Sequence, residues 1–298
     1  MARIVTIPLL LRTLTPLHVG AGRRGREVDL PVQRDSKEVP MIPSTSIRGT
    51  FRTFIRYVLG ENDEELLGEH VGEIRHLLRE PRQGKIYFTD AYLFLYPLTH
   101  NGRTIYLTSR YCIYRTTNIL SLCGLEDLKC KIEINDYEKE NIILRTRDKV
   151  INIHLKYSNN LKSFFTQVLE NIYHIDNAGR IIESIRLVDD EYLIEIINQH
   201  NLKVRRIALR DEGYLLKKVE EGALWCEEYV PSNTFFILAV ACYEDVLSKL
   251  MNILRRVKVS LLQVGGRETI GKGFCKLYVG TCNYLENTLS YSSKSILQ

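Results

Sequence analysis

The sequence has no apolar segment of the ~18 residues that a membrane-spanning helix requires, and it has no C-x-x-C pair. Its first apolar stretch, Ile4 to Leu11, contains Pro8 and ends at Arg12, and no small-residue cleavage site follows. This stretch is too short and wrongly flanked for a signal peptide. We therefore expect a cytoplasmic protein without a membrane partner.

The seven cysteines are an odd number, and the closest pairs are Cys123 with Cys130 and Cys275 with Cys282. These spacings exclude the common zinc-binding and thioredoxin-type motifs and argue against a disulfide framework. We expect unpaired, buried thiols, because free cysteine behaves as a small apolar side chain in a protein core.

Hydrophobic residues (45%) and charged residues (26%) occur near the globular average, which excludes wholesale disorder. A length of 298 residues suits one elaborated domain or two closely merged ones. Residues 1–60 hold ten basic and four acidic residues, a net charge of +6, whereas the rest of the chain carries a net charge of −1. This concentration is typical of a protein that binds a polyanion, but a solvated face without a partner fits the composition equally well.

The first 60 residues predict a strand, a long loop and a helix. Alternating Ile, Val, Thr and Leu predict a strand from Arg3 to Leu14, and glycines and prolines predict a loop from Thr15 to Pro43. A helix should begin within Ser44–Ser46, which offers N-caps, run to about Leu59 and end at Gly60. Its basic stripe, separate from its apolar face, consists of Arg48, Arg52 and Arg56.

Similar patterns predict the remaining elements. The predicted helices are Asp63–Arg79, Leu161–Tyr173, Asp190–His200 and Glu244–Arg256. The predicted strands are Lys85–Tyr96, Lys129–Ile134, Ile142–Tyr157, Thr234–Cys242, Val257–Val264 and Phe274–Val279. Lys203–Leu209 and Tyr214–Val219 flank a turn signal at 210–213 and predict a projecting hairpin.

Strand–helix–strand units at both ends, joined by an irregular middle, predict an α+β fold with a ferredoxin-like or RNA-recognition-like sheet and large insertions. We expect one elaborated domain over residues 1–282. Its sheet comes from the N-terminal and C-terminal thirds, and a middle region is inserted at about 100–222. Residues 283–298 are rich in Ser and predict a polar tail.

Residues 20–25 have the G-x-G-x-x-G spacing of a dinucleotide-binding loop and follow a predicted strand. That site also needs a helix that begins at the last glycine and an acidic residue ~20 positions further on. Here Pro31 interrupts the segment that should be helical, and the ~20-residue mark falls in Pro40–Pro43. We therefore reject a dinucleotide site.

What remains is a flexible loop whose arginines can contact phosphates: Arg23, Arg24, Arg26 and Arg34. Asp29 lies among them, beside Val28 and Leu30, and Pro31 stiffens the chain that follows. By residue chemistry alone, the simplest role for Asp29 is an ion pair with a neighbouring arginine.

A second glycine cluster spans residues 265–273 between two predicted strands. Gly265 and Gly266 precede Arg267, and Lys272 stands between two further glycines, so the loop would expose N–H groups and cations together. Anion-binding nests have this composition. An ordinary hairpin loop needs fewer glycines, so we favour phosphate binding here.

Six segments spread over the chain form a recognisable set. The stronger ones are T-P-L-H-V-G-A-G (15–22), V-D-L-P-V-Q-R (28–34), I-P-S-T-S-I-R-G (42–49) and the loop 265–273; the weaker ones are F-T-D-A (88–91) and G-A-L-W-C-E-E-Y-V-P (222–231). In this order they resemble the RAMP superfamily of CRISPR-associated proteins, and most closely the repeated backbone subunit of type III-B (Cmr) effector complexes. Ser44 and Arg48 depart from the pattern, since the family often has glycine and lysine there.

The resemblance implies that copies of this chain stack into a helical filament along a CRISPR guide RNA, together with other Cmr subunits. It implies that a thumb-like hairpin from each copy, for which Lys203–Val219 is our candidate, wedges into the guide–target duplex. The family cleaves single-stranded target RNA once per subunit with a divalent metal, Mg²⁺ or Mn²⁺. Its loop aspartate matches Asp29, so the resemblance favours a catalytic and metal-binding role over the ion pair.

Other site residues also follow from the resemblance. His18, Glu227 and Tyr229 match further positions implicated in the family and are candidates to assist cleavage. The candidates for contact with the RNA backbone are Arg23, Arg24, Arg48, Arg52, Gly265, Gly266, Arg267 and Lys272. Recognition must use backbone and shape, because a guide's sequence varies and base pairing reads the target.

Three alternatives remain open. A non-catalytic scaffold subunit would bind guide RNA and use Asp29 only as an ion-pair partner. A RAMP that processes guide precursors usually has a histidine near the first helix, whereas His18 precedes the loop. The backbone subunit of type III-A complexes is the nearest alternative, and the segments Val32–Arg34 and Trp225–Pro231 argue against it.

Overall fold

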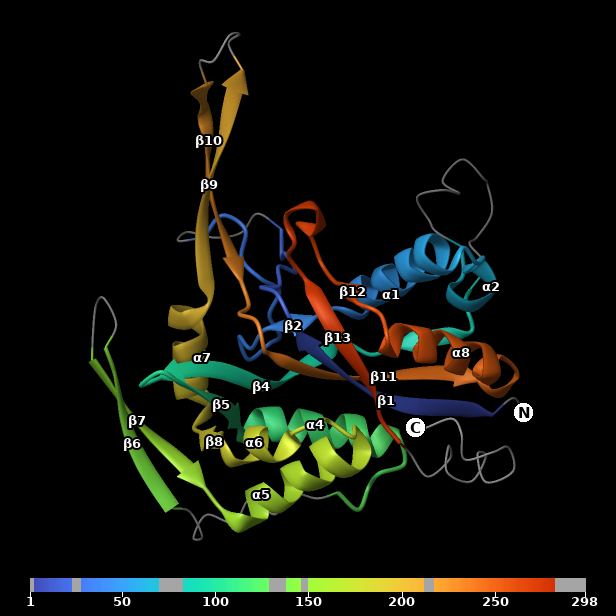
Figure 1. The fold of residues 1–298 in the computed structure, drawn as a ribbon, viewed down its shortest axis with the longest axis horizontal. Coiled ribbons are helices and arrows are strands. Elements are labelled where there is room, and N and C mark those ends of the chain that lie inside the picture. Colours follow the sequence, from blue (N-terminus) through green and yellow to red (C-terminus); the bar gives the residue numbers. More distant parts are fainter. Residues whose placement is uncertain are drawn as a thin grey trace.

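The fold is built on one large, mostly antiparallel sheet (Figure 1). The computed structural model describes residues 3–22, 28–69, 83–128, 138–145, 150–211 and 217–281. Within these residues the sheet has the order β12-β13-β1-β11-β4-β5-β8-β7-β6, with β2 paired to β4 and β3 paired to β11. Only the β5–β8 pair among the described strands is parallel. The sheet and the helices on both of its faces confirm the predicted α+β class.

Four strands form the centre of the sheet in the order β13-β1-β11-β4, and each neighbouring pair is antiparallel. They are β1 (Ile4–Thr13), β4 (Ala91–His100), β11 (Phe235–Tyr243) and β13 (Phe274–Val279). One connection contains α1 (Ser44–Thr53) and the π-helical turn η1 (Phe54–Leu59), and the other contains η3 (Glu244–Val246) and α8 (Leu247–Lys258). Short strands lie beside this unit: β2 (Met41–Ile42), β3 (Ile86–Phe88) and β12 (Leu262–Gln263).

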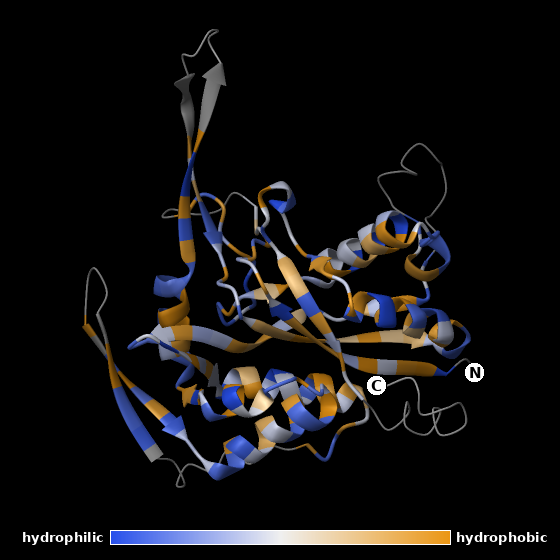
Figure 2. Cartoon of the chain, viewed as in Figure 1, coloured by the Kyte–Doolittle hydropathy of each residue, from blue (hydrophilic) through white to orange (hydrophobic). Residues whose placement is uncertain are grey.

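The central strands contribute to two hydrophobic cores, one on each face of the sheet. In β11, Phe236 and Leu238 pack in the core that contains α1 and α8. Phe235 and Ile237 pack in the core that contains α4 (Arg110–Leu122), α5 (Asn159–Thr166) and α6 (Ala178–Glu183). Because successive side chains of a strand point to opposite faces, a strand covered on both faces must be apolar throughout. Figure 2 shows this as largely orange central strands.

Residues 103–200 extend the same sheet and supply helices to both of its faces (Figure 1). The helices within 110–183 pack in the second core, and the helix at 190–200 packs in the core that contains α1 and α8. The strands are β5 (Arg103–Ser109), β6 (Glu138–Arg145), β7 (Val150–Tyr157) and β8 (Ile185–Val188). The helices are α4 (Arg110–Leu122), α5 (Asn159–Thr166) with its π-helical continuation η2 (Gln167–Ile172), α6 (Ala178–Glu183) and α7 (Asp190–His200). The middle of the chain therefore shares its sheet with the two ends.

A long two-stranded hairpin projects from the body of the molecule (Figure 1). It consists of β9 (Leu202–Asp211) and β10 (Lys217–Tyr229), which pair with each other and not with the main sheet. The predicted hairpin is confirmed, although β10 continues ten residues beyond the expected Val219 and ends against the body of the molecule. This longer strand brings the segment 222–231 to the base of the hairpin.

Most predicted elements near the two ends are confirmed, including the helix that ends at Gly60. Pro43 is the N-cap, and the backbone N–H of Ser44 donates to Asp90 at 2.7 Å, so the predicted hydroxyl cap is wrong and a distant carboxylate replaces it. The predicted strand Val257–Val264 is also largely wrong, because α8 continues to Lys258 and β12 has two residues.

Some predictions concern residues outside the described ranges. Of the helix predicted at Asp63–Arg79, the structure describes α2 (Glu64–Leu67). The strand Lys129–Ile134, the hairpin turn and the tail 283–298 lie outside. The five described cysteines form no disulfide, as predicted: Cys112, Cys123, Cys226, Cys242 and Cys275. Among the described residues no helix is long and apolar enough to cross a membrane.

Candidate functional site

The base of the projecting hairpin is joined to the N-terminal loop. Isolated bridges link Leu17 with Val230 and Leu30 with Glu227. The N–H of Leu30 donates to the oxygen of Cys226, and the N–H of Glu228 donates to the oxygen of Leu30, both at 3.0 Å. The loop residues 17–32 and the end of β10 therefore form one structural unit, although they lie far apart in the sequence.

Asp29 lies at this junction and is partly buried. Its Oδ2 accepts a hydrogen bond of 2.8 Å from the backbone N–H of Cys226. Among the described residues no arginine pairs with Asp29, and its Oδ1 has no partner. The backbone bond therefore fixes one oxygen of the carboxylate and leaves the other available.

Glu227 is completely buried and accepts hydrogen bonds from four side chains. Its Oε1 accepts from Trp225 Nε1 at 2.7 Å and from Arg267, and its Oε2 accepts from Arg206 Nε at 3.2 Å and from the hydroxyl of Tyr229. Since each carboxylate oxygen has two lone pairs, these four bonds saturate the group. Glu227 is therefore the centre of a cluster that joins β9, β10 and the second glycine loop.

The bonds around Glu227 determine its charge. Burial would raise its pKa, but hydrogen bonds from Trp225 and Tyr229 and the charge of Arg267 lower the pKa to about 2. Burial and the hydrogen bond to Glu227 raise the pKa of Tyr229, so that its hydroxyl keeps its proton. The ring of Tyr229 also faces the ammonium group of Lys272, which lies 5.5 Å from the ring centroid.

His18 is buried beside this cluster, with its ring 5.4 Å from that of Tyr229. Its Nδ1 lies 2.7 Å from the backbone oxygen of Glu228. Because a carbonyl oxygen only accepts, Nδ1 must donate, and the neutral ring then presents Nε2 as an acceptor. A Cβ at Gly20 would lie 2.9 Å from this Nε2, so glycine leaves the nitrogen uncovered.

The second glycine loop is fastened to the first loop through backbone contacts. The N–H of Gly266 donates to the oxygen of His18 at 3.0 Å, and the N–H of Gly273 donates to the oxygen of Pro16 at 2.9 Å. Gly265 has φ = 75°, and a Cβ there would collide with the oxygen of His18. These contacts use N–H groups that a nest would offer to phosphate, so the side chains of Arg267 and Lys272 are the better candidates for binding it.

A second buried carboxylate, Glu228, fixes the opposite side of β10. Its Oε1 accepts from Arg34 at 2.7 Å and from Asn201 at 2.8 Å, and its Oε2 accepts from the N–H of Val32 at 3.0 Å. Asn201 accepts in turn from the buried hydroxyl of Tyr96 at 3.0 Å. Arg34, predicted to contact phosphate, therefore has an ion-pair partner within the protein.

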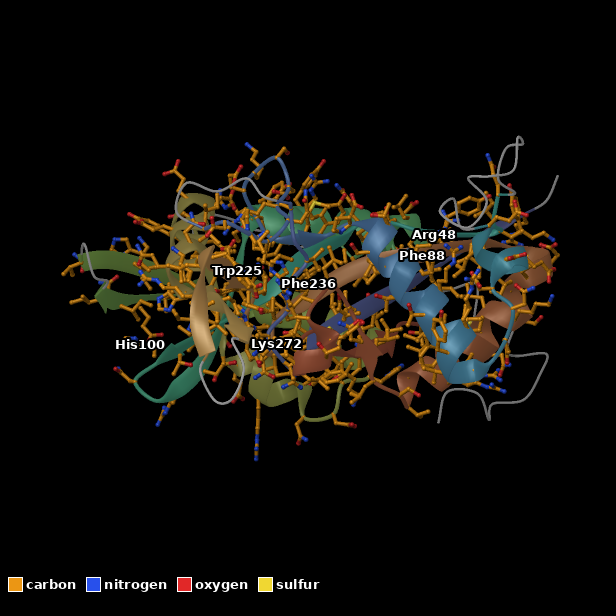
Figure 3. All side chains as sticks on the ribbon, turned by 90° about the horizontal axis from the view of Figure 1, so that it is seen from above. Arg48, Phe88, His100, Trp225, Phe236 and Lys272 are labelled. Carbon is orange, nitrogen blue, oxygen red and sulfur yellow. The ribbon has the colours of Figure 1, made fainter. Side chains whose placement is uncertain are left out.

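The basic stripe of α1 lies apart from this cluster. Figure 3 shows Arg48 beside Phe88, away from Trp225 and Lys272. Arg48 donates to the backbone oxygen of Leu67, and burial together with nearby Arg52 lowers its pKa. An RNA contact by Arg48 stays a prediction.

Arg52 makes more hydrogen bonds within the protein than Arg48 does. It donates to Asp63 at 2.6 Å and to the oxygen of Gly68 at 2.6 Å, and its side chain is 12% exposed. Its predicted contact with guide RNA also stays untested, but it would have to exchange these bonds for phosphate. Two other candidates, Arg23 and Arg24, lie outside the described residues.

The described residues do not build a multidentate metal site. No three His, Cys, Asp or Glu side chains among them form a group that could hold a metal ion. Mg²⁺, however, is commonly held by one or two carboxylates, with water and substrate phosphates as its remaining ligands. The free Oδ1 of Asp29 fits such a site, whereas the saturated carboxylate of Glu227 does not.

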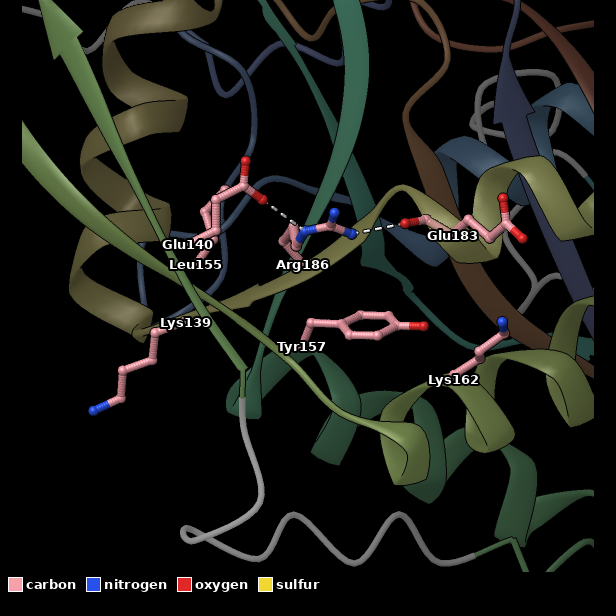
Figure 4. A pocket seen from close by; sticks show the side chains of 7 residues that line it. All are labelled: Lys139, Glu140, Leu155, Tyr157, Lys162, Glu183 and Arg186. Atoms are coloured by element: carbon pink, nitrogen blue, oxygen red, sulfur yellow. Dashed lines mark hydrogen bonds and ion pairs between the residues drawn. The ribbon is translucent and has the colours of Figure 1, made fainter.

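A pocket of about 400 Å³ lies elsewhere, between the β6–β7 hairpin and the helices α5 and α6 (Figure 4). One of its three cationic residues, Arg186, is paired with Glu140 at 3.3 Å and donates to the oxygen of Glu183 at 2.7 Å. The guanidinium also lies 5.3 Å from the ring of Tyr157. Arg186 is therefore satisfied within the protein, whereas Lys139 and Lys162 line the pocket without a partner among the described residues. None of the predicted site residues lines this pocket.

The structure thus brings together six of the predicted site residues: His18, Asp29, Glu227, Tyr229, Arg267 and Lys272. Sequence reasoning missed Arg206 and the hydrogen bond from Trp225. A signal was present, since Trp225, Glu227 and Tyr229 alternate and must share one face of a strand, and residues of β9 opposite them face the same way. Arg206 is paired with Trp225 in the register of the hairpin.

Comparison with known proteins gives a family match over most of the chain. The family model described as RAMP superfamily matches residues 10–276. A "CRISPR system Cmr endoribonuclease Cmr4" from Pyrococcus furiosus is 28% identical over 279 residues, which cover 90% of this chain and 93% of that protein. A "CRISPR system CMR subunit Cmr4" from Saccharolobus solfataricus is 27% identical, covering 91% of this chain and 95% of that protein.

Solved structures show the same fold. A chain in the cryo-EM structure of "the Type III-B Cmr-beta bound to cognate target RNA" superposes with a TM-score of 0.66 at 26% identity, covering 92% of this chain and 96% of that one. A chain of "oligomeric Cmr4 from Pyrococcus furiosus" has a TM-score of 0.64 at 22% identity, covering 92% and 98%. The similarity therefore extends over most of the chain.

Proposed function

The chain belongs to the RAMP superfamily, and from this premise we propose that it is a backbone subunit of a type III-B CRISPR complex. In this role it binds a CRISPR guide RNA, lies beside further copies of itself and other Cmr subunits, and cleaves a complementary single-stranded target RNA. Support comes from similarity to two Cmr4 proteins along nine-tenths of the chain, one of which is named as an endoribonuclease.

The position of Asp29 is the observation that carries the proposed cleavage. Its carboxylate stands at the base of the hairpin, held through Oδ2 by the N–H of Cys226, with Oδ1 unpaired among the described residues. Arg206, Arg267 and Lys272 surround the neighbouring Glu227–Tyr229 pair. An available carboxylate beside a group of cations suits a site that holds the phosphate of an RNA strand and moves a proton near it.

Cleavage in this site would use the RNA's own 2′-hydroxyl. When a nucleotide is displaced from a duplex, its 2′-oxygen can lie in line with the adjacent phosphorus, so the protein need only position groups and assist proton transfer. We assign to Asp29 Oδ1 the task of accepting or relaying the proton of that hydroxyl. Mg²⁺ or Mn²⁺, held by Asp29, would stabilise negative charge on the phosphate.

His18 is the second group that we assign to proton transfer. Its Nδ1 donates to the oxygen of Glu228, which orients the ring and leaves Nε2 as the reactive nitrogen. A protonated Nε2 can supply the proton that the leaving 5′-oxygen requires. Gly20 keeps this nitrogen uncovered, so a substrate atom can reach it.

We also propose that the central sheet is a ferredoxin-like palm and that the β9–β10 hairpin is the thumb that enters the guide–target duplex. The order β13-β1-β11-β4, with a helix in the connection after β1 and another in the connection after β11, supports the palm. The separation of the hairpin from the main sheet supports the thumb.

The test of cleavage is a complex rebuilt with Asp29→Asn and incubated with complementary target RNA. Asparagine keeps the size of the side chain but removes the charge that a base or a metal ligand needs, so we expect cleavage to fall by ~10²–10⁴-fold. RNA affinity should hold or rise, because the surrounding cations remain. Chelation of divalent metal should stop cleavage by the wild-type complex and leave it assembled.

Glu38→Gln is the matched control, because Glu38 is an exposed acidic residue of the same N-terminal loop. It should cleave at the wild-type rate. Full cleavage by the Asp29→Asn complex would contradict the catalytic assignment and leave a non-catalytic RNA-binding scaffold as the function.

A further inference from the structure

Glu227 does not have the properties of a group that reacts with RNA. Its side chain is fully buried, and all of its lone pairs accept hydrogen bonds from Trp225, Tyr229, Arg206 and Arg267. A general base needs a lone pair that can reach the proton it removes. Glu227 has two charged partners, Arg206 and Arg267, which come from different elements. Because the carboxylate has no free lone pair for RNA, its function must be exerted through the positions of these two arginines.

Arg206 and Arg267 approach Glu227 from opposite elements and keep most of their donors. Arg206 belongs to β9 of the hairpin and Arg267 to the second glycine loop, and their side chains are 30% and 40% exposed. Arg206 gives two of its five N–H donors, one to Glu227 and one to Tyr229, and Arg267 gives one to Glu227. The remaining donors of both guanidinium groups have no partner among the described residues.

Without Glu227, two guanidinium groups this close would repel each other. The carboxylate between them cancels one of the two charges and fixes both forks, so that their outer donors are held ready for an anion. Preorganised donors bind better than mobile ones, since less side-chain freedom is lost on binding. Arg267 has φ = 69°, a backbone conformation that is uncommon for a non-glycine residue and that is consistent with a specified side-chain position.

We propose that Arg206 and Arg267 form a two-arginine clamp for one phosphodiester of RNA, and that Glu227 is the positioning residue that holds the clamp together. This proposal rests on the proposed RNA-binding function and adds to it a ligand for Arg206, whose role the sequence did not indicate. An RNA phosphate is the anion that fits, because two arginine forks match its oxygens in geometry and a phosphodiester carries one negative charge. The clamp joins the hairpin to the glycine loop, so it would hold RNA where the hairpin leaves the body of the molecule.

The first experiment compares Arg206→Ala with Arg205→Ala in the assembled complex. Both arginines lie on β9, but Arg205 is exposed, is opposite Cys226 in the register and points to the other face of the strand. Both variants are made with Asp29→Asn, so that cleavage does not disturb the measurement of target-RNA affinity. Arg206→Lys is added, because lysine keeps the charge but cannot bind Glu227, Tyr229 and a phosphate as a fork.

For Arg206→Ala we expect target-RNA affinity to fall about 10-fold to 100-fold, the value of a hydrogen bond between charged groups. The log–log salt dependence should weaken by ~0.7, since one phosphate contact is lost. Arg206→Lys should keep the salt dependence and lose part of the affinity. Arg205→Ala should bind target RNA with the same affinity as the complex that carries Asp29→Asn alone. Equal losses for Arg206→Ala and Arg205→Ala would overturn the clamp.

Two arms identify which strand supplies the phosphate. Assembly on guide RNA and binding of target RNA by the assembled complex are measured separately for Arg206→Ala. A loss in either arm, or in both, supports the clamp and assigns the phosphate to that strand. Wild-type values in both arms overturn it. If the wild-type complex itself bound no RNA, the proposed function would fail instead, so the two failures are distinguishable.

The positioning role of Glu227 is tested by a double-mutant cycle. Glu227→Gln alone should lower RNA affinity by about as much as Arg206→Ala, because both arginines lose their common acceptor. In a background that already has Arg206→Ala and Arg267→Ala, the same change should have less than about a twofold further effect, since residues that act through each other are not additive. An equal loss in both backgrounds would show that Glu227 acts on RNA without the arginines.

Discussion

Two buried carboxylates in this protein are each held by two arginines, and the difference between them is instructive. Asp63 binds Arg52 and Arg56 near the end of α1, and Glu227 binds Arg206 and Arg267 at the base of the hairpin. Both acids are completely buried, and in both the arginines lower the pKa of the carboxylate. By charge alone the two centres are alike.

They differ in what the arginines do with their other donors. Arg52 donates to the oxygens of Leu67 and Gly68 as well as to Asp63, and its side chain is 12% exposed. Arg206 and Arg267 are 30% and 40% exposed and keep donors without partners among the described residues. The Asp63 centre therefore stabilises the fold around α1, whereas the Glu227 centre is arranged to bind an anion. The two centres have the same number of arginines. Their roles differ because the arginines at Glu227 are more exposed and keep N–H donors that no protein group among the described residues uses.

The largest effect on stability should come from Asp63→Ala. Removal of one member of a buried ion pair leaves the other charges uncompensated, which costs about 3–5 kcal/mol in the free energy of unfolding. Urea unfolding of the purified chain measures this. The variant should retain wild-type RNA affinity at temperatures where it is folded. If the folded variant lost RNA affinity instead, the Asp63 centre would also bind RNA and would not differ in function from the Glu227 centre.

Acidification should affect the Glu227 centre strongly. The folded pKa of Glu227 is about 2, below the ordinary value of 4.5, so its stabilising contribution is complete above pH 4.5 and disappears as the pH falls towards 2. The loss is on the order of 3 kcal/mol for a difference of this size. Unfolding followed from pH 6 to pH 2 should show a shallower loss for Glu227→Gln than for the wild-type chain. Identical pH profiles would contradict the ionised state assigned to Glu227.

A smaller effect is expected in the loop that presents Arg267. Gly265→Ala places a Cβ against the oxygen of His18 at a positive φ, so the loop must shift at a cost of about 1–3 kcal/mol. Gly266→Ala is the matched control, because a Cβ there meets nothing within 4 Å. RNA affinity should fall for Gly265→Ala and stay near the wild-type value for Gly266→Ala. If the two variants bound RNA with equal affinity, the geometry of this loop would not matter for RNA binding and the prediction would be wrong.

The elements near the two ends of the chain could be predicted because their patterns are local. Alternating apolar residues and a terminal glycine suffice to find β1 and the helix that ends at Gly60. The middle was harder: α4, β5 and β8 were missed, since each is short or has a mixed pattern and is stabilised by packing in the sheet. Tertiary contacts decide such segments.

The candidate site divides in the same way. Resemblance to a family pointed to Asp29, His18, Glu227 and Tyr229, and the structure brings these residues to one junction. The RNA contacts predicted for the basic stripe of α1 stay a prediction. No local pattern shows that Arg52 already binds Asp63, which is 11 residues away, and the backbone oxygen of Gly68. Likewise, no local pattern links Glu227 to Arg267, which lies 40 residues further on. Pairings of this kind depend on the fold.

The comparison of the two centres is tested most directly by measuring both stability and RNA affinity for Arg52→Ala and Arg206→Ala. We expect opposite results for RNA affinity. Both substitutions remove a partner of a buried carboxylate and lower the free energy of unfolding, but Arg52→Ala leaves RNA affinity unchanged, whereas Arg206→Ala lowers it about 10-fold or more. Urea unfolding and filter binding on the same preparations supply the two values. A loss of RNA affinity confined to Arg52→Ala would contradict the account, because it would place the RNA contact at the Asp63 centre.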